Sequence, residues 1–351
     1  TKVSTTASAT ATPTGGISGY AKPNGKVFTI NGTATHFMGT NSYYIGFLNN
    51  NADIDLIMSH VQATGLKVLR LWGFNDVTSL PSGDTVWYQS FIKGQDPVIN
   101  TGANGLQRLD YVVKSAEEHG ISLIINFVNN WSDFGGMPAY ASYYGISVTQ
   151  WYTSTAAQTQ YRKYIAAVVA RYKTSTAVFA WELANEPRCT FCSTSVITNW
   201  VAATSAYIKS LDSNHMVCIG DEGFGLNGGW DITWPYWGIT GLSFKNNLAI
   251  STIDFGTYHA YPGSWFELDA WVPSWIRSHA TAAAALGKPV ILEEYGTKSA
   301  KSAMVSWQTA VLDTQTAGDM YWQYGDSLSY GLTHDDGHTI YYGSADYATL
   351  V

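Results

Sequence analysis

The chain has 351 residues, a length that suits a single α/β barrel. Charged residues make up 13% of the sequence and the formal net charge is −7, which argues against a nucleic acid as partner because a phosphate backbone would call for a basic patch. No window approaches the roughly 18 consecutive apolar residues of a membrane span, so we expect no membrane partner either.

The first 18 residues differ in composition from the rest. Residues 1–16, TKVSTTASATATPTGG, are almost all Thr, Ser, Ala, Pro and Gly, a composition that cannot bury enough apolar surface to fold and is typical of an O-glycosylated linker. We expect residues 1–18 to be a disordered tail of a secreted, extracellular protein, and residues 19–351 to form a single domain. Two Asn-x-Ser/Thr sequons, at Asn31 and Asn130, would allow N-glycosylation there.

The predicted elements begin with a short β-hairpin, because residues 26–37, KVFTINGTATHF, alternate around Asn31-Gly32, the strongest short hairpin signal. After it, apolar runs typical of buried strands alternate with stretches of helical period. The runs cover residues 35–41, 66–74, 121–130, 178–186, 216–223, 253–261, 288–296 and 318–326, and the helical stretches cover residues 54–64, 106–119, 158–172, 196–211, 268–285 and 303–314. No clear long helix separates the fifth run from the sixth.

Eight nearly continuous apolar strands with helices between them predict an α/β fold, the parallel (β/α)8 or TIM barrel, preceded by the short N-terminal hairpin. A doubly wound open sheet is the alternative. The sequence has no G-x-G-x-x-G after the first strand and no phosphate-binding loop, so nothing indicates a nucleotide at a switch point of such a sheet. The barrel is therefore the predicted fold.

The stretch AWELANEPRC, residues 180–189, carries two glutamates four residues apart. In a helix Glu182 and Glu186 would share a face, but Pro187 disfavours the helical region for the residue before it. A strand is therefore favoured, with Glu186 at its carboxyl end, where barrel enzymes place their chemistry, and Glu182 deeper as a buried structural carboxylate.

The three cysteines divide unevenly. Cys189 and Cys192 form a C-x-x-C just after Pro187, and Cys218 lies in an apolar run. Zinc is disfavoured because no second C-x-x-C or paired His offers the remaining ligands. A redox C-x-x-C would precede a helix, whereas a loop is expected here. In a secreted protein these features favour a local Cys189–Cys192 disulfide, with Cys218 a buried free thiol.

Polar or aromatic side chains follow almost every predicted strand, and a parallel barrel would gather them at one mouth. Each one alone could be a core or surface residue, but several charged groups converging on one mouth are hard to explain as packing. The set comprises Arg70, Trp72, Asn129, Asn130, Trp131, Asn185, Glu186, Asp221, Glu222, His259, Tyr261, Glu293, Glu294 and Trp322.

Two carboxylates across a small gap, with aromatic residues around them and no metal ligands in sight, are typical of glycoside hydrolysis. The 14 Trp and 23 Tyr support a sugar ligand, since flat rings hold the apolar faces of sugars, although they can also simply pack. Carboxylates about 5 Å apart would indicate a retaining mechanism, and carboxylates about 6.5–9.5 Å apart an inverting one.

From about Gly19 onward the chain resembles glycoside hydrolase family 5, and within it the secreted fungal endo-β-1,4-mannanases. Six motifs in family order carry the resemblance: VLRLWGFND, INFVNNWSDFGGM, AWELANEPRC, GDEGFG, TYHAYP and LEEYG. The resemblance implies endo-acting, retaining hydrolysis of β-1,4-mannosidic bonds in mannan, galactomannan and glucomannan, without a cofactor or a metal.

The resemblance also assigns roles to residues. Glu186 becomes the acid/base and Glu294 the nucleophile, and because adjacent strand residues point to opposite faces, Glu293 is expected behind the site. The nucleophile Glu294 would be kept ionised by Arg70 and would accept a hydrogen bond from Tyr261. We expect the pKa of Glu186 to be raised by partial desolvation and by the charge of Glu294, with His259 orienting it.

The remaining residues are expected to bind the sugar chain. Asn185 would form a hydrogen bond with the 2-hydroxyl of the sugar at the cleavage point, and Trp322 would form the floor of the subsite that holds this sugar. Trp131 would stack against a sugar on the glycon side. On the aglycon side the resemblance implies Arg188, with Glu222 as a further sugar-binding carboxylate. Trp72 and Asn129 complete the predicted set.

Other functions remain open at this point. An endo-β-1,4-glucanase of the same family shares the chemistry and is the nearest alternative; a non-catalytic sugar-binding barrel would be expected to lose one carboxylate, and a metal-dependent hydrolase would need a ligand cluster. We expect a monomer. The Ser/Thr-rich start resembles linkers that join some mannanases to a cellulose-binding module, which would lie upstream.

Overall fold

The structure is a computed structural model that describes residues 17, 19–226 and 231–351. The predicted tail, residues 1–18, lies outside the described residues except for Ile17. Ile17 packs against the core, and its carbonyl oxygen accepts a hydrogen bond from the Thr176 hydroxyl at 3.0 Å. Among the described residues, contacts with the barrel therefore include Ile17, two residues before the predicted start of the domain.

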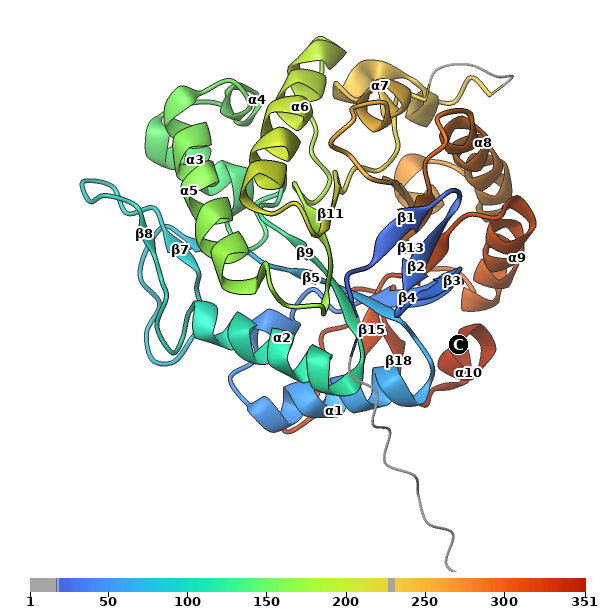
Figure 1. The fold of residues 1–351 in the computed structure, drawn as a ribbon, viewed down its shortest axis with the longest axis horizontal. Coiled ribbons are helices and arrows are strands. Elements are labelled where there is room, and N and C mark those ends of the chain that lie inside the picture. Colours follow the sequence, from blue (N-terminus) through green and yellow to red (C-terminus); the bar gives the residue numbers. More distant parts are fainter. Residues whose placement is uncertain (1–16, 18, 227–230) are drawn as a thin grey trace, which may run out of the picture.

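Eight parallel strands form the barrel, confirming the predicted fold (Figure 1). They are β4 (Phe37–Asn41), β5 (Val68–Trp72), β9 (Ser122–Asn126), β10 (Val178–Glu182), β11 (Met216–Cys218), β12 (Gly256–Ala260), β13 (Val290–Tyr295) and β14 (Gly318–Tyr321). Almost every residue in them is buried, as expected when the barrel interior covers one face and helices the other. Between β11 and β12 the barrel is closed by two backbone bonds, from Asp254 N–H to Val217 and from His259 N–H to Glu222.

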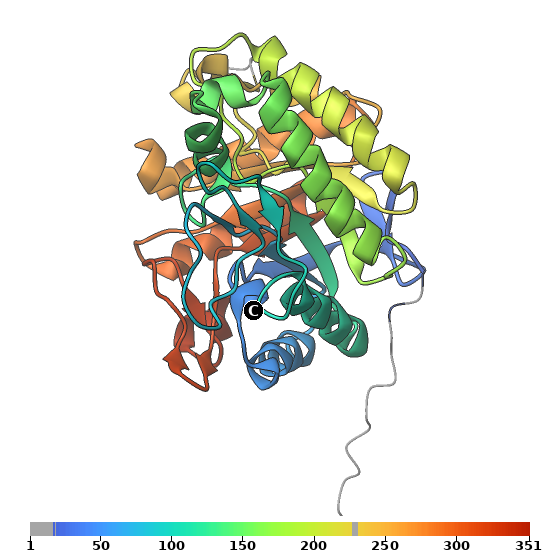
Figure 2. The ribbon, with the colours of Figure 1, turned by 90° about the vertical axis from the view of Figure 1, so that its left-hand side faces the viewer.

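All six predicted helices are present around the barrel, and Figure 2 shows α5 and α6 lying side by side. They are α1 (Asn51–Ala63), α2 (Leu106–His119), α5 (Thr155–Tyr172), α6 (Thr194–Leu211), α8 (Val272–Ala285) and α9 (Met304–Thr314). The helix predicted from residue 268 begins four residues later, because Leu268 is extended and Pro273 occupies the first turn of α8. Between β11 and β12 there is only the short α7 (Phe244–Leu248), as the sequence indicated.

Several short elements were not predicted. They are α3 (Gly136–Tyr144), α4 (Val148–Trp151), α10 (Ala345–Leu350), and the strands β6 (Asp76–Val77), β7 (Gln89–Ser90), β8 (Val98–Ile99), β15 (Tyr324–Gly325), β16 (Ser327–Leu328), β17 (Gly331–Leu332) and β18 (Ile340–Tyr341). None of the described helices is both long enough and apolar enough to cross a membrane.

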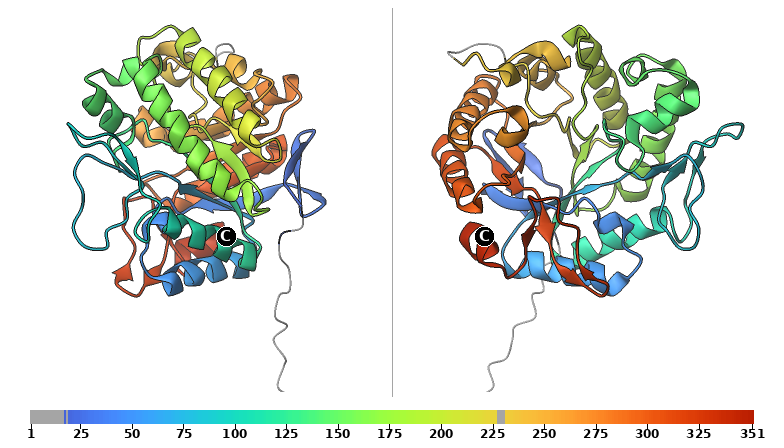
Figure 3. Two further views of the ribbon diagram at one scale, coloured as in Figure 1. Left: turned by 60° about the vertical axis from the view of Figure 1, so that its left-hand side comes forward. Right: turned by 180° about the vertical axis from the view of Figure 1, so that it is seen from behind.

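The predicted hairpin is part of a three-stranded antiparallel sheet of β1 (Lys22–Asn24), β2 (Val27–Ile30) and β3 (Thr33–Thr35). Asn31 and Gly32 have φ angles of 51° and 74°, as a two-residue hairpin turn of this type requires. This sheet covers the amino-terminal end of the barrel, nearest the viewer in Figure 1 and on the far side in the right-hand view of Figure 3. There the buried Phe28 packs against Phe37, Phe179 and Phe255.

The two sequons lie in different surroundings. Asn31 is exposed at the tip of the hairpin, so it stays a possible glycosylation site. Asn130 is buried, and its side-chain oxygen accepts a hydrogen bond from the backbone N–H of Arg188 at 3.3 Å. A glycan needs a solvent-exposed side chain, so the folded chain disfavours modification of the buried Asn130.

Candidate active site

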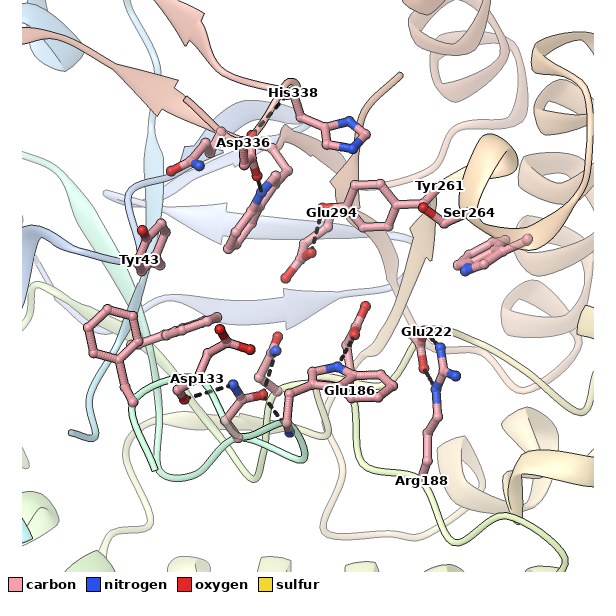
Figure 4. A pocket seen from close by; sticks show the side chains of 18 of the residues that line it. Tyr43, Asp133, Glu186, Arg188, Glu222, Tyr261, Ser264, Glu294, Asp336 and His338 are labelled. Carbon is pink, nitrogen blue, oxygen red and sulfur yellow. Dashed lines mark hydrogen bonds and ion pairs between the residues drawn. The ribbon is translucent and has the colours of Figure 1, made fainter. Parts of the chain in front are cut away.

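A cleft of about 560 Å³ lies at the carboxyl end of the barrel strands (Figure 4). Ten of the twelve residues predicted to be catalytic or substrate-binding line it: Trp72, Asn129, Trp131, Asn185, Glu186, Arg188, Glu222, Tyr261, Glu294 and Trp322. The two others, Arg70 and His259, are fully buried behind the carboxylates and act on the cleft through them. Figure 4 shows Glu186 and Glu294 on facing walls of the cleft.

Glu186 lies four residues beyond the end of β10, not in the strand as predicted. Its φ is 49°, a left-handed conformation that is uncommon for a residue with a side chain. Its backbone N–H bonds the carbonyl oxygen of Gly220 at 2.8 Å, and Gly220 can approach so closely because a Cβ there would lie 2.1 Å from the Ala184 carbonyl oxygen. Such conformations cluster at functional sites, where the surrounding structure holds them.

Glu294, in β13, is held by two donors. Arg70 Nη1 donates a hydrogen bond to its Oε1, and the Tyr261 hydroxyl donates to its Oε2 at 2.7 Å. Both contacts are those the sequence predicted. The same Arg70 forms a bidentate pair with Glu182 at 2.7 Å for each bond, so Glu182 is the deeper structural carboxylate that we expected.

The two carboxylates are close together. A carboxylate oxygen of Glu186, one of Glu294 and a ring nitrogen of His259 all lie within 4.8 Å of one another. This spacing corresponds to the retaining arrangement of about 5 Å and not to the inverting one. The same three residues could in principle hold a metal ion, but Arg70 already supplies a positive charge to Glu294, so a cation there would meet a guanidinium.

Glu293 lies behind the site and outside the cleft lining, as expected, but it does not get there by strict alternation along the strand. The pairing of β13 shifts register at this point: Tyr258 pairs with Leu292, whereas the next residue, His259, pairs with Glu294. This β-bulge leaves Glu293 as an extra residue and turns its side chain inward, where its Oε2 lies 3.4 Å from His259 Nε2. Strict alternation along the strand therefore fails at the EE pair, and both glutamates face the interior.

The environment of Glu186 also differs from the prediction. Burial would raise its pKa, but the hydrogen bond and charge of His259, the charge of Arg188 and the Trp131 N–H outweigh it and lower the pKa to about 2. His259 Nδ1 lies 2.9 Å from Glu186 Oε1, and the Trp131 indole donates to Oε2 at 2.6 Å. The predicted rise is therefore wrong for the cleft as it stands, because an imidazole that carries a proton contacts the carboxylate directly.

His259 is the group that gains affinity for a proton. Burial alone would lower its pKa, but the charge of Glu294 and the hydrogen bonds to Glu186 and Glu293 raise it well above the usual value. In this arrangement the proton that an acid catalyst needs lies on the imidazole, within hydrogen-bond distance of Glu186.

Asn185 is fixed on both sides. Its side-chain oxygen accepts from Arg70 Nη2 at 2.7 Å, and its amide donates to the Asn129 side chain at 3.0 Å. One amide hydrogen is left for the cleft, as binding a sugar hydroxyl would require. Trp322 is held in the same way, because its indole donates to Asp336 at 2.7 Å and its ring stacks on Tyr43 at 5.5 Å.

Arg188 and Glu222 form one bidentate ion pair at the other end of the cleft (Figure 4). The guanidinium lies 4.9 Å from the Trp131 ring centre and 5.1 Å from the Phe224 ring centre. Trp131 thus contacts both Arg188 and Glu186, and its stacking on a glycon sugar stays a prediction.

The predicted disulfide is present, between Cys189 and Cys192, whose Cα atoms lie 5.4 Å apart. The loop that it closes is docked by backbone bonds from Cys189 N–H to Thr240 and from Phe191 N–H to Ile239. It therefore fixes the segment directly after Arg188. Cys218 is a free, buried thiol, as expected.

Sequence reasoning missed half of the residues that line the cleft. They are Tyr43, Asp133, Phe134, Trp234, Ser264, Trp265, Gln323, His334, Asp336 and His338. Tyr43 could have been found, since it follows β4 as the other candidates follow their strands. Gln323 follows β14 in the same way, and the others come from longer connecting segments. Phe134 is aimed by Gly135, which has a φ of 88° and where a Cβ would lie 2.1 Å from the carbonyl oxygen of Asp76.

A (β/α)8 barrel with two facing glutamates about 5 Å apart in an aromatic cleft defines a glycoside hydrolase of the retaining type. The family model described as "Cellulase (glycosyl hydrolase family 5)" matches residues 21–327. The chain belongs to glycosyl hydrolase family 5.

Individual relatives agree with this family. The chain is 58% identical over 334 residues to a probable mannan endo-1,4-beta-mannosidase A of Aspergillus niger, covering 94% of this chain and 87% of the relative. It is 56% identical to mannan endo-1,4-beta-mannosidase A of Aspergillus aculeatus, covering 95% and 89% of the two chains. Among solved structures, the endo-1,4-beta-mannanase of Rhizomucor miehei matches with a TM-score of 0.87 at 36% identity, covering 95% and 97%.

Proposed function

We propose that this protein is an endo-acting, retaining β-1,4-mannanase that hydrolyses mannan, galactomannan and glucomannan by double displacement. The observation that carries the proposal is the placement of Glu186 and Glu294 within 4.8 Å of each other across the cleft. The choice of mannan as substrate is supported by the names of the relatives, whose similarity extends over most of this chain and most of each relative.

In the first step, Glu294 attacks the anomeric carbon while Glu186 protonates the leaving oxygen, which gives a covalent glycosyl-enzyme and a shortened chain. Arg70 and Tyr261 hold the Glu294 carboxylate in place through their hydrogen bonds. The free amide hydrogen of Asn185 would reach the 2-hydroxyl of the sugar, a contact that strengthens in the transition state.

In the second step, Glu186 accepts a proton from a water that attacks the anomeric carbon from the side the leaving group has vacated. The configuration at that carbon is restored, and Glu294 is released as a carboxylate. The Arg188–Glu222 pair lies on the leaving-group side in this scheme, and Trp322 and Tyr43 flank the sugar that becomes attached to the enzyme.

The test compares hydrolysis of galactomannan, glucomannan and carboxymethyl cellulose by the protein and by its Glu186→Ala and Glu294→Ala variants. We expect the mannans to be cleaved faster than cellulose, and each variant to lose about 10³-fold or more in kcat. A matched control, Glu118→Ala, removes an exposed carboxylate paired only with Lys114 and should stay fully active.

Each alternative has its own outcome in this test. Faster turnover of carboxymethyl cellulose would make the protein an endoglucanase, and no turnover of any polymer would favour a sugar-binding barrel. If proton NMR of the first products shows the inverted anomer, the retaining mechanism is contradicted. An active Glu294→Ala variant would contradict the role of Glu294 as nucleophile.

We also propose that the protein works outside the cell, as a monomer. The Cys189–Cys192 disulfide supports an oxidising compartment. Size-exclusion chromatography with light scattering would test the monomer, and the mass of the secreted protein before and after deglycosylation would test both secretion and a glycan on Asn31.

A further inference from the structure

The site contains one buried acidic group that the mechanism above does not use. Glu293 is fully buried, and its Oε1 has no hydrogen-bond partner among the described residues. Its Oε2 lies 3.4 Å from His259 Nε2 and 3.8 Å from Arg70 Nε. A buried carboxyl with one oxygen unpaired is costly, so its retention directly beneath the catalytic pair calls for a function.

His259 joins this carboxyl to the acid/base. One ring nitrogen, Nδ1, lies 2.9 Å from Glu186 Oε1, and the other, Nε2, faces Glu293. A neutral imidazole has one N–H, so it can donate to one of these glutamates only while it accepts from the other. A ring that carries both protons, as the raised pKa of His259 indicates, donates to both glutamates in their ionised forms, and giving one proton to either glutamate leaves a neutral ring.

The charges around Glu293 favour a shared proton. Arg70 from β5 is the permanent cation facing it, whereas Glu182 from β10 is a second carboxylate, and the Cys218 thiol from β11 lies in the same cluster. Glu182 and Glu294 already take hydrogen bonds from Arg70. One guanidinium cannot neutralise all of these carboxylates, so the cluster retains a proton at working pH.

The carboxylates around His259 also favour a proton within the cluster. Glu186 and Glu294 face its Nδ1, the latter at 3.6 Å, and Asp221 and Glu222 of the loop after β11 also interact with its charge. Burial and the charge of Glu182 raise the pKa of Glu293 to about 7, within the range in which it can exchange a proton with the ring.

We propose that Glu293 is a positioning residue for the acid/base, which exchanges one proton with Glu186 through His259. In one form Glu186 carries the proton and donates to Nδ1, while Nε2–H donates to ionised Glu293. In the other form Glu293 carries the proton and donates to Nε2, while Nδ1–H donates to ionised Glu186. Passing from the second form to the first moves the Glu293 proton to Nε2 and the Nδ1 proton to Glu186, and the net charge is unchanged.

This exchange explains how Glu186 obtains the proton it needs. The empty cleft favours the form in which Glu186 is ionised, because His259, Arg188 and Trp131 stabilise its charge. A bound sugar chain excludes water from Glu186 and disfavours that charge. The proton can then reach Glu186 from inside the protein, over a 2.9 Å contact, and need not enter from solvent. The inference rests on the proposed role of Glu186 as acid/base.

The test is the pH dependence of kcat/KM for mannan hydrolysis by the wild type, Glu293→Gln and Glu293→Asp. The basic limb reports the loss of the shared proton from the free enzyme. Glu293→Gln removes one negative charge, so the remaining proton is lost more readily and the basic limb should move to lower pH by about one unit. Glu293→Asp keeps the carboxyl and should move the limb back towards the wild-type position.

Two controls separate this role from a structural one. Asp319→Asn removes another buried barrel carboxyl, bonded to Tyr295 and not to His259, and should leave the limb unmoved. With a dinitrophenyl β-mannobioside, whose leaving group needs no acid, the limb should be absent from kcat/KM in the wild type and in Glu293→Gln alike.

The outcomes are distinct. A wild type that does not cleave mannan would remove the proposed function. An active wild type, with a Glu293→Gln variant whose rate falls equally at every pH, would leave that function standing and refute the proton exchange. Should Glu293→Gln fail to fold, Glu293→Met decides in its place, because it also removes the negative charge and should move the basic limb to lower pH; an unmoved limb would refute the proton exchange.

Discussion

At the scale of single residues, Arg70 determines the geometry of the site. It is fully buried, and its guanidinium donates to Glu182, Glu294, Asn185 and Asn41. A planar fork with five N–H donors can satisfy four such partners at once, and an ammonium group cannot. One side chain therefore positions the proposed nucleophile and the amide that would bind the sugar.

We predict that Arg70→Lys impairs activity and stability together. Misplacing Glu294 by as little as about 1 Å should lower kcat by about 10²-fold or more. Loss of the bidentate pair leaves buried Glu182 poorly compensated and should lower the free energy of unfolding by about 3 kcal/mol. Kinetics on galactomannan and urea unfolding measure the two effects.

The control is Arg171→Lys. Arg171 forms a similar two-bond pair with Asp110, but both side chains are partly exposed, so its replacement should cost less than about 1 kcal/mol and leave kcat unchanged. If the two substitutions had equal effects on kcat and stability, neither the burial of Arg70 nor its contacts could explain its predicted effect.

At the scale of elements, the hairpin sheet at the amino-terminal end of the barrel stabilises the fold without touching the cleft. We predict that Phe28→Ala lowers the free energy of unfolding by about 3–5 kcal/mol, because Phe28 is fully buried against Phe37, Phe179 and Phe255. The rate kcat, measured well below the new melting temperature, should not change, since the cleft lies at the opposite end.

The surface substitution Leu312→Ala serves as the control, because 72% of that side chain is exposed in α9 and its loss should change stability by no more than about 0.5 kcal/mol. A Phe28→Ala protein with normal stability but reduced kcat would contradict the separation of the two barrel ends.

The elements also show how far the sequence could predict the structure. All eight strands follow from nearly continuous apolar runs, because both faces of a barrel strand are buried, and the six long helices follow from a period of 3.6 residues, because one face of each is buried. The short α3 and α4 lack enough turns for a period to show. The inward turn of Glu293 depends on a register shift between β12 and β13, which is a property of two paired strands and not of either sequence alone.

For the site, prediction worked where a residue lies near the end of a strand or directly after it. Arg70, Tyr261 and Glu294 make the contacts that we expected. It failed for residues such as Trp265 and His338, whose positions depend on packing against segments distant in sequence, with Trp265 against Phe224 and His338 against Tyr261. The predicted rise in the pKa of Glu186 was wrong for a related reason. Burial raises this pKa and the protonated His259 lowers it, and which effect is larger depends on distances that the sequence does not give.

At the scale of the whole molecule, several buried acids should make the fold more stable at mildly acidic than at alkaline pH. Burial raises the pKa of Asp319 to about 6, and that of Asp221 to about 7. Such groups keep their protons in the folded state after the unfolded chain has lost them, so stability falls as the pH rises from about 4 through the folded pKa values. His279 opposes this trend, since burial lowers its pKa to about 4 and stability rises with pH between that value and its usual 6.5.

The acids outnumber the histidine, so we predict a higher midpoint of urea unfolding at pH 5 than at pH 8. Asp319→Asn tests the cause, because the amide oxygen can still accept the Tyr295 hydroxyl bond, which is 2.6 Å long in the native chain, but carries no charge. A shift of about two pKa units corresponds to about 3 kcal/mol, so the variant should gain up to that amount relative to the wild type at pH 8 and almost nothing at pH 4. A wild-type midpoint that rises steadily from pH 5 to pH 8 would mean that His279 and the paired carboxylates, and not the buried acids, dominate the pH dependence of the fold.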